Sequence, residues 1–255
     1  MSFKNILWEK EGAVAKLTIA RPPLNILDIA TMKEIDSVLA SLEGDAETKV
    51  LVLTGEGKAF SAGVDVADHT EEKVDEMMTV FHRICRRLFS LGMPTVAVLN
   101  GMALGGGCEL AVCCDLVIAS EKARIGQPEI TVGVFPPVAA VVFPRLLGRF
   151  KTLELLLTGE AVEAREAERI GLISKAVPHD QLQTATDELV GKLTGMSGVL
   201  LRLTKQAVYQ GLDLSFDAAL DGSERIYLEE LMKTEDVHEG LQAFMEKRPP
   251  VWKDR

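Results

Sequence analysis

The fold of this chain is decided by Thr95-Val-Ala-Val-Leu-Asn-Gly-Met-Ala-Leu-Gly-Gly-Gly-Cys-Glu109 and the apolar residues that follow it. The stretch opens with a short run of buried-strand character and then passes through a glycine-rich turn. Residues 108–113 favour a short buried helix, and 116–119 favour another apolar strand. A strand, a turn and a helix that leads into the next strand are typical of an α/β fold, in which function concentrates in the loops beyond the strand ends.

The same alternation of strand and helix extends on both sides of this stretch. Further strands are predicted at 6–9, 14–19 and 50–54. Further helices are predicted at 29–42, 71–89, 153–157, 163–169, 181–193, 199–209, 216–231 and 237–246. Asp28 or Thr31 is available to cap the first helix, and Gly44 to end it. The pattern leaves open whether the helices after Ser197 form a subdomain, an oligomer contact or a cap on the same core.

The composition indicates a folded, acidic protein. With 255 residues, 47% of them hydrophobic, the chain can bury a substantial core as one large domain with or without a smaller appendage. The 38 acidic residues outnumber the 28 Lys and Arg, and the net charge of -10 repels a phosphate backbone. We therefore expect no nucleic-acid partner, although a few local cations and backbone N–H groups can bind an anionic ligand.

The cysteines and the apolar runs indicate the cellular location and exclude several kinds of site. The four cysteines are Cys85, Cys108, Cys113 and Cys114. They suit neither a disulfide framework nor the C-x-x-C spacing of structural zinc, so we expect reduced thiols and no metal. The first residues do not resemble a signal peptide, and no apolar run reaches the roughly 18 to 20 residues of a membrane span. A cytoplasmic protein that does not bind membranes is expected.

Two glutamates stand out because each lies among small and turn-forming residues in an apolar stretch. They end the sequences Leu104-Gly-Gly-Gly-Cys-Glu109 and Gly126-Gln-Pro-Glu129. Apolar surroundings disfavour a charged carboxylate and raise its pKa, and two such groups facing one site can divide the roles of acid and base. The alternative is that Glu109 and Glu129 merely cap helices. The pair predicts acid–base chemistry if both side chains face one cavity.

Two loops of small residues suggest where a carbonyl oxygen would bind. Glycines at 105–107 let the backbone approach a ligand closely, and the amino end of the following helix would offer it unpaired N–H groups. The loop Phe60–Asp65, just after a predicted strand, can add another N–H to form an oxyanion hole. A purely structural turn is the alternative for the three glycines. No Gly-x-Ser-x-Gly, Cys–His pair or Gly-Lys-Ser/Thr is apparent, so nucleophilic catalysis and a phosphate-binding loop are not indicated.

Together the motifs resemble the enoyl-CoA hydratase (crotonase) family nearly from end to end. They are Ser61-Ala-Gly-Val-Asp65, Asn100–Glu109, Cys114-Asp115, Gly126-Gln-Pro-Glu129, Leu157-Thr-Gly159, Ala167–Ile173 and Gly240–Arg248. The resemblance implies an α/β spiral of ββα units. Residues 1–196 would form the core with the active site, and 197–255 a helical region that packs subunits into a trimer or a dimer of trimers.

The resemblance also implies roles for individual residues. The N–H groups of Val64 and Gly106 would bind the thioester oxygen, Glu109 would activate water and Glu129 would protonate carbon, although a coupled pair can resist a unique assignment. Further contacts to the substrate or its coenzyme A are implied for Ala62, Asp65, Val66, Pro128, Phe244 and Lys247. The last two commonly come from a neighbouring subunit, where a cation suits a phosphate. No cofactor is implied beyond the coenzyme A of the substrate itself.

One segment departs from ordinary hydratases of this family. After Gly133 they tend to have Pro-Gly-x-Gly-Gly-Thr, whereas this chain reads Val134-Phe-Pro-Pro-Val-Ala-Ala-Val141. The prolines stiffen the start of the next helix, and Val138 and Ala139 add bulk where glycines would stand. A different pocket wall is therefore expected, one less suited to a flexible straight acyl chain.

A narrower resemblance follows from this segment together with Asn25-Ile-Leu-Asp28 and Ile226–Met232. It is to the cyclohexa-1,5-diene-1-carbonyl-CoA hydratases of anaerobic benzoyl-CoA degradation. Such an enzyme would add water to the ring diene in a 1,4 sense and give 6-hydroxycyclohex-1-ene-1-carbonyl-CoA. The proton would then reach a carbon away from the alpha carbon.

Several alternatives remain open. A general short-chain trans-2-enoyl-CoA hydratase would have the same acids and the same oxyanion loops. An isomerase is less expected because both acids are retained. A non-catalytic acyl-CoA or RNA-binding member of the fold is a different class, but RNA would favour a basic stripe, and the Lys and Arg here are dispersed. His69 lies where it either tunes the substrate mouth or faces solvent.

Overall fold

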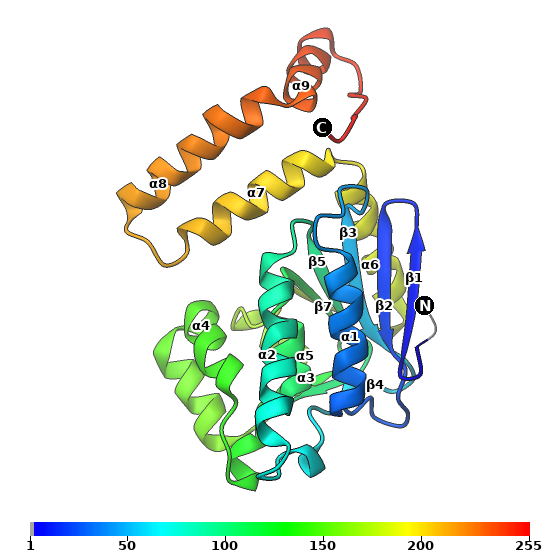
Figure 1. The fold of residues 1–255 in the computed structure, drawn as a ribbon, viewed down its shortest axis with the longest axis vertical. Helices are drawn as coiled ribbons and strands as arrows, with labels where there is room; N and C mark the ends of the chain where they lie inside the picture. Colours follow the sequence, from blue (N-terminus) through cyan, green and yellow to red (C-terminus); the bar gives the residue numbers. More distant parts are fainter. Residues whose placement is uncertain (1–2) are drawn as a thin grey trace.

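The structure, a computed structural model, describes residues 3–255 and places the strands in two sheets (Figure 1). The larger sheet comprises, in spatial order, β1 (Ile6–Glu11), β2 (Val14–Ile19), β3 (Val50–Gly55), β5 (Thr95–Leu99), β7 (Leu116–Ser120) and β10 (Lys175–Val177). The smaller sheet comprises β4 (Ala59–Ser61), β6 (Met102–Leu104), β8 (Arg124–Gly126) and β9 (Val162–Glu163). The predicted hairpin is confirmed: β1 and β2 pair in antiparallel register, and the larger sheet continues from β2 in parallel pairs.

Successive parts of the chain send one strand to each sheet. β3, β5 and β7 lie in the larger sheet, while β4, β6 and β8, which follow them, pair in parallel in the smaller sheet. Each of these strand pairs is followed by a helix: α2 (Val74–Ser90), α3 (Gly106–Val112) and α4 (Pro137–Thr158). This arrangement confirms the implied spiral of ββα units. The predicted glycine-rich turn after β5 also contains a strand, β6, which the sequence did not suggest.

The remaining helices cover the sheets and form the C-terminal region. They are α1 (Ile29–Ser41), α5 (Ala164–Arg169), α6 (Leu182–Thr194), α7 (Gly198–Gly211), α8 (Phe216–Arg225) and α9 (Glu235–Glu246). Shorter turns are η1 (Val66–Asp68), η2 (Pro128–Val132), η3 (His179–Gln181), η4 (Ile226–Glu230) and η5 (Leu231–Lys233). The helix predicted over 216–231 is confirmed as helical backbone through Glu230, but it comprises α8 and then the π-helical turn η4, which begins at Ile226.

Two further helix predictions need correction for physical reasons. The helix predicted over 153–157 is the end of the much longer α4, inside which Gly148 adopts a φ of 72°. That left-handed residue kinks the helix, and Pro144 just before it further obscures the helical pattern in the sequence. The helix predicted to begin at 71 begins at Val74, because the preceding residues form a turn in which Lys73 N–H donates to Thr70.

The first helix follows the sequence closely. Asp28 is its N-cap, with Oδ1 accepting from the Thr31 N–H at 2.8 Å and from the Thr31 hydroxyl at 2.7 Å. Met32, Ile35 and other apolar residues at helical spacing are buried against the core. Asp28 rather than Thr31 is therefore the cap, and the helix ends one residue before the predicted end.

The central strands of the larger sheet are buried on both faces. In β3, Leu51 and Leu53 belong to the main core with α1, α2 and α3, whereas Val50 and Val52 belong to a second cluster with Leu182 of α6. This alternation follows from the period of two along a strand. The candidate site residues follow β4, β6 and β8, at the carboxyl ends of strands in the smaller sheet.

The C-terminal helices stand apart from the two sheets. In Figure 1, α7 and α8 lie side by side above the sheets, α9 lies beyond them, and the C-terminus returns to the start of α7. α7 begins next to the predicted boundary at 196/197, with Ser197 as its N-cap. Whether residues 197–255 form a separate domain stays a prediction.

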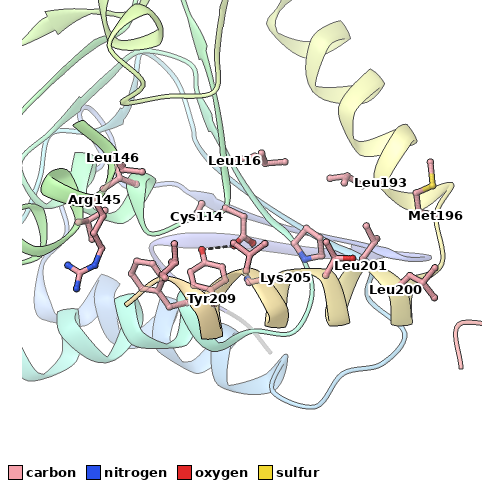
Figure 2. Close-up of a pocket in the computed structure, with 18 of the residues that line it drawn as sticks. Cys114, Leu116, Arg145, Leu146, Leu193, Met196, Leu200, Leu201, Lys205 and Tyr209 are labelled. Atoms are coloured by element: carbon pink, nitrogen blue, oxygen red, sulfur yellow. Dashed lines mark hydrogen bonds and ion pairs between the residues drawn. The ribbon is translucent and has the colours of Figure 1, made fainter. Parts of the chain in front are cut away.

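One of the polar clusters that attach α7 to the core lies beside an apolar cavity of about 870 Å³. Figure 2 shows Leu200, Leu201, Lys205 and Tyr209 along α7 at this cavity. Lys205 Nζ lies 2.8 Å from Asp115 Oδ2, and the Tyr209 hydroxyl donates to Asp115 Oδ1 at 2.8 Å. This buried cluster fixes one face of α7 to the residues that begin β7.

Candidate active site

A cavity of about 550 Å³ opens where the segments after β4, β6 and β8 meet. Glu109 and Glu129 both line it, as do the backbones of Val64 and Gly106. The segment between η2 and α4 forms one wall. α2 forms another, contributing Val74, Met77, Met78, Phe81 and His82. The two predicted acids and the two predicted oxyanion residues thus come from three separate segments to one cavity, because Gly106 and Glu109 both lie on α3.

Glu109 is held at the bottom of this cavity by the start of α4. It lies on α3 with 3% of its surface exposed, and its Oε1 accepts a hydrogen bond from the Ala139 N–H at 2.8 Å. Burial raises the pKa of Glu109 to about 7, while the Ala139 N–H opposes this rise and the nearby charge of Glu129 adds to it. Near neutral pH this carboxyl group can therefore give or take a proton.

Glu129 lies in η2, and burial raises its pKa to about 7 as well. The fully buried Gln127 has its amide oriented so that the NH₂ group donates to both Glu129 carboxylate oxygens, at 3.0 and 3.1 Å, and to the Gly105 carbonyl at 3.3 Å. A Cβ on residue 105 would lie 2.8 Å from Glu129 Oε1, and Gly105 has a φ of 53°. Glycine is required there because the carboxylate packs directly against the backbone.

Val64 and Gly106 present backbone N–H groups from two loops in contact. Gly106 is the first residue of α3, so its N–H has no partner within the helix. A Cβ on residue 106 would lie 3.3 Å from Val64 N, so a side chain there would fill the space beside that amide. Within residues 3–255, neither N–H donates to a turn, loop or cap carbonyl. The two groups can together stabilise charge on one carbonyl oxygen.

Some of the other predicted contact residues line the cavity, and others do not. Ala62, Val66 and Pro128 line the cavity. Asp65 is not among the lining residues; its Oδ1 accepts from the Ala67 N–H at 3.0 Å and caps η1. His69 lines the cavity and is also exposed to solvent, with Nδ1 3.0 Å from the Asp65 carbonyl oxygen, so its role stays a prediction.

Phe244 and Lys247 do not line the cavity of their own chain. Both lie at the end of α9, which is at the opposite end of the molecule from the start of α2 (Figure 1). Phe244 is 85% exposed, so its ring has little packing against its own chain. A role for these two residues at the cavity therefore requires a neighbouring subunit.

Sequence reasoning missed several residues that shape the cavity. The apolar positions of α2 were interpreted only as helix packing, although Met77, Met78 and Phe81 also face the cavity. Gln127 gave a weak signal as a polar residue in an otherwise apolar stretch. The Ala139 N–H gave none, because a backbone donor has no signature in the sequence.

The next two observations concern metal ligands and membrane-spanning helices among residues 3–255. No three His, Cys, Asp or Glu side chains between residues 3 and 255 come together as a possible metal site. Across the same residues, no helix is both long and apolar enough to cross a membrane.

Known proteins match the chain almost end to end. The family model described as enoyl-CoA hydratase/isomerase matches residues 9–255. The short-chain-enoyl-CoA hydratase of Clostridium acetobutylicum is 39% identical over 97% of this chain and 97% of that protein. The 2,3-dehydroadipyl-CoA hydratase of Escherichia coli is 34% identical over 99% of this chain and 100% of that protein.

A solved structure agrees with these relationships. An enoyl-CoA hydratase from Bacillus anthracis matches with a TM-score of 0.95 at 34% identity, and the match covers 99% of this chain and 100% of that one. The sequence match extends over both the spiral core and the C-terminal helices. The chain therefore belongs to the enoyl-CoA hydratase/isomerase family.

Proposed function

We propose that this enzyme is a hydro-lyase that adds water to a double bond conjugated with the carbonyl of an acyl-CoA thioester. One observation carries the proposal: Glu109 and Glu129 line the same cavity as Val64 and Gly106. Acids with pKa values near 7 and paired N–H donors are the groups that such an addition requires. The hydratase relatives support the same reaction class.

The geometry suggests an order of steps. The thioester oxygen accepts hydrogen bonds from the Val64 and Gly106 N–H groups, and a water lies between the two carboxyl groups. Ionised Glu109 takes a proton from the water as its oxygen bonds to the β carbon, and the electron pair moves toward the thioester oxygen. Protonated Glu129 then gives its proton to carbon. The Ala139 N–H favours the charged form of Glu109 and so suits it to the role of base.

For the acyl group, we propose cyclohexa-1,5-diene-1-carbonyl, hydrated to the 6-hydroxycyclohex-1-ene product in benzoyl-CoA degradation. The segment that departs from ordinary hydratases contributes Val134 to Pro137 to the cavity wall. Met77, Met78 and Phe81 face the same space from α2. A stiff, apolar wall suits a flat hydrocarbon ring that loses little conformational entropy on binding.

A short-chain trans-2-enoyl group is the second candidate. It is supported by the Clostridium acetobutylicum relative, whose name specifies short-chain substrates. Both candidates use the same glutamates and the same oxyanion loops. They differ in what the wall between η2 and α4 accommodates.

The decisive experiment offers purified protein cyclohexa-1,5-diene-1-carbonyl-CoA and crotonyl-CoA, and follows water addition by chromatography and mass spectrometry. A strong preference for the ring diene supports the narrower proposal, and a preference for crotonyl-CoA overturns it while retaining the reaction. Glu109→Gln and Glu129→Gln are the controls, each expected to lower kcat by about 10²- to 10⁴-fold while the fold is retained. Unchanged rates in both variants would refute the two-acid mechanism.

We also propose that the enzyme is a cytoplasmic homo-oligomer, a trimer or a dimer of trimers. Large apolar side chains are exposed on the C-terminal helices, including Phe216 at 78%, Leu228 at 65% and Phe244 at 85%. Large exposed apolar side chains favour a protein–protein contact. A second copy packed there would also bring its α9 toward a neighbouring cavity, where Lys247 of the partner subunit would contact a coenzyme A phosphate.

A further inference from the structure

We propose that Asn25 and Ser61 are positioning residues that set the direction of the Val64 N–H in the oxyanion hole. We call their hydrogen-bonded connection the Asn25–Ser61 relay. The inference rests on the thioester-binding role proposed above for Val64. Neither residue lines the cavity, so both act through the backbone of the loop between β4 and η1.

Asn25 ties the segment after β2 to the turn between β3 and β4. It is fully buried, and its amide NH₂ donates to the Glu56 carbonyl at 2.9 Å and to the Ala59 carbonyl at 2.8 Å. Its Oδ1 accepts from the Arg21 N–H at 3.0 Å. The backbone of Asn25 has a φ of 53°, a left-handed conformation that asparagine tolerates better than most residues. Asn25 thus adopts the required backbone conformation and bonds three backbone polar groups with its side chain.

Ser61 connects the Asn25 segment to the loop that carries Val64. Its fully buried hydroxyl donates to the Asn25 carbonyl at 2.7 Å and accepts from the Gly63 N–H at 3.1 Å. The hydroxyl is therefore bonded on both sides, with one partner in each segment. Gly63 has a φ of 105°, a conformation that glycine adopts freely and that needs outside restraint to persist.

The pairing between the two segments determines where the Val64 N–H points. Leu27 N–H donates to the Gly63 carbonyl at 2.9 Å, and the Asp65 N–H donates to the Leu27 carbonyl at 3.1 Å. These bonds form a parallel bridge between Leu27 and Val64. In such a bridge the neighbours of Val64 make the bonds, so the N–H of Val64 itself points away from Leu27. On that side lie Gly106 and the cavity.

The relay matters for rate because an oxyanion donor is useful only when it is aligned. Hydrogen bonds weaken steeply as the donor angle departs from linearity. Removing a whole oxyanion donor lowers kcat by about 10²- to 10³-fold in well-studied enzymes. Loosening Gly63, which directly precedes Val64, should cost part of that factor without removing any group that contacts the substrate.

The test compares Ser61→Ala with Thr54→Val. Ser61→Ala breaks the relay, whereas Thr54→Val removes another hydroxyl-to-carbonyl bond, the 2.8 Å bond from Thr54 to Val98 between β3 and β5. We expect Ser61→Ala to lower kcat roughly 10-fold or more with a much smaller change in KM, and Thr54→Val to leave kcat within about twofold. Whichever acyl-CoA the unmodified enzyme hydrates serves as substrate. An equal loss of kcat in both variants would overturn the proposal.

A spectroscopic measurement separates the relay from general loss of stability. A dimethylaminocinnamoyl-CoA thioester absorbs at longer wavelength when hydrogen bonds polarise its carbonyl, and this shift requires no turnover. We expect the full shift in the unmodified protein and in Thr54→Val, and a smaller shift in Ser61→Ala. Asn25→Gly keeps the left-handed backbone without the amide and should also reduce the shift, which preserves the test if Ser61→Ala does not fold.

The outcomes distinguish the two levels of inference. If the unmodified protein shifts the absorption and both relay variants do so equally, the relay proposal is wrong and the thioester site stands. If the unmodified protein binds the thioester without any shift, the proposed oxyanion hole is wrong and the relay falls with it. Reduced shifts confined to Ser61→Ala and Asn25→Gly support the relay.

Discussion

At the scale of single residues, Glu109 couples the chemistry of the cavity to the stability of the fold. Its carboxyl group is almost fully buried, and the raised pKa means that the folded protein holds a proton that the unfolded chain releases near pH 4.5. Ionising the group in the folded state therefore costs free energy. Buried ionisable groups with shifted pKa values of this kind are concentrated at functional sites, where they transfer protons.

This coupling predicts a pH dependence of stability with a definite sign. Between about pH 4.5 and 7 the folded state binds more protons than the unfolded state, so the free energy of unfolding should fall as pH rises through this window. A shift of this size corresponds to roughly 3 kcal/mol for Glu109 at most. Urea unfolding at pH 5 and pH 7.5 should show a larger decline for the unmodified protein than for Glu109→Gln. Parallel declines would contradict a raised pKa at Glu109.

The sequence identified the acids but not what holds them. Glu109 and Glu129 were recognisable because acidic residues are unusual between glycines and apolar residues. Gln127 and the Ala139 N–H were not, because their role depends on which segments fold against each other. Asp65 was predicted to contact the substrate because it lies in a family motif, but its side chain caps η1 and does not line the cavity.

At the scale of elements, one buried ion pair links the middle of α7 to the core. Lys205 and Asp115 are both largely buried, and the Lys205 ammonium also donates to the Leu88 and Met93 carbonyls at 3.3 and 3.2 Å. By contrast, the ion pair between Arg145 and Asp213 at the rim of the same cavity is mostly exposed. The two pairs should therefore contribute very differently to stability.

We predict that Lys205→Met lowers the free energy of unfolding by about 3 to 5 kcal/mol, because Asp115 is left buried without its cation. Arg145→Met should cost no more than about 1 kcal/mol, since its pair is screened by water. Chemical denaturation of both variants under identical conditions gives the comparison. A similar small loss in both would show that solvent reaches the Asp115 cluster.

Element lengths explain which parts of the fold were predictable. β3 and β5 are continuous apolar runs, and α1 repeats its apolar positions over several turns, so each leaves a clear pattern. β6 and β8 are three residues long, too short for any periodicity. The π-helical turn at Ile226 also escaped prediction, since its side chains continue the helical pattern of α8.

At the scale of the whole molecule, the proposed oligomer and the substrate site are linked through α9. Lys247 is exposed at the end of that helix and remote from the cavity of its own chain. If a neighbouring subunit supplies it, the coenzyme A part of the substrate is bound across an interface. Assembly would then set affinity rather than the rate of the chemical step.

We predict that Lys247→Ala raises KM for the acyl-CoA substrate by roughly 10-fold, the effect of losing one charge-assisted bond to a phosphate, and leaves kcat nearly unchanged. A pantetheine thioester, which lacks the nucleotide phosphates, should bind both proteins equally. Lys192→Ala, an exposed lysine on α6, is the control. Sedimentation velocity should detect a trimer or hexamer of the 27.8 kDa chain. A monomer with unaltered KM in Lys247→Ala would refute the linkage.

The strands of the larger sheet lie in the order in which the chain is synthesised, from β1 at one edge to β10 at the other. During synthesis, each new strand of this sheet can therefore pair with a neighbouring strand that has already left the ribosome. No later strand has to be inserted between two that are already paired. The cavity, however, needs the start of α4 to hold Glu109. The growing polypeptide thus acquires its scaffold strand by strand but becomes competent for chemistry only after more than half of it has been made.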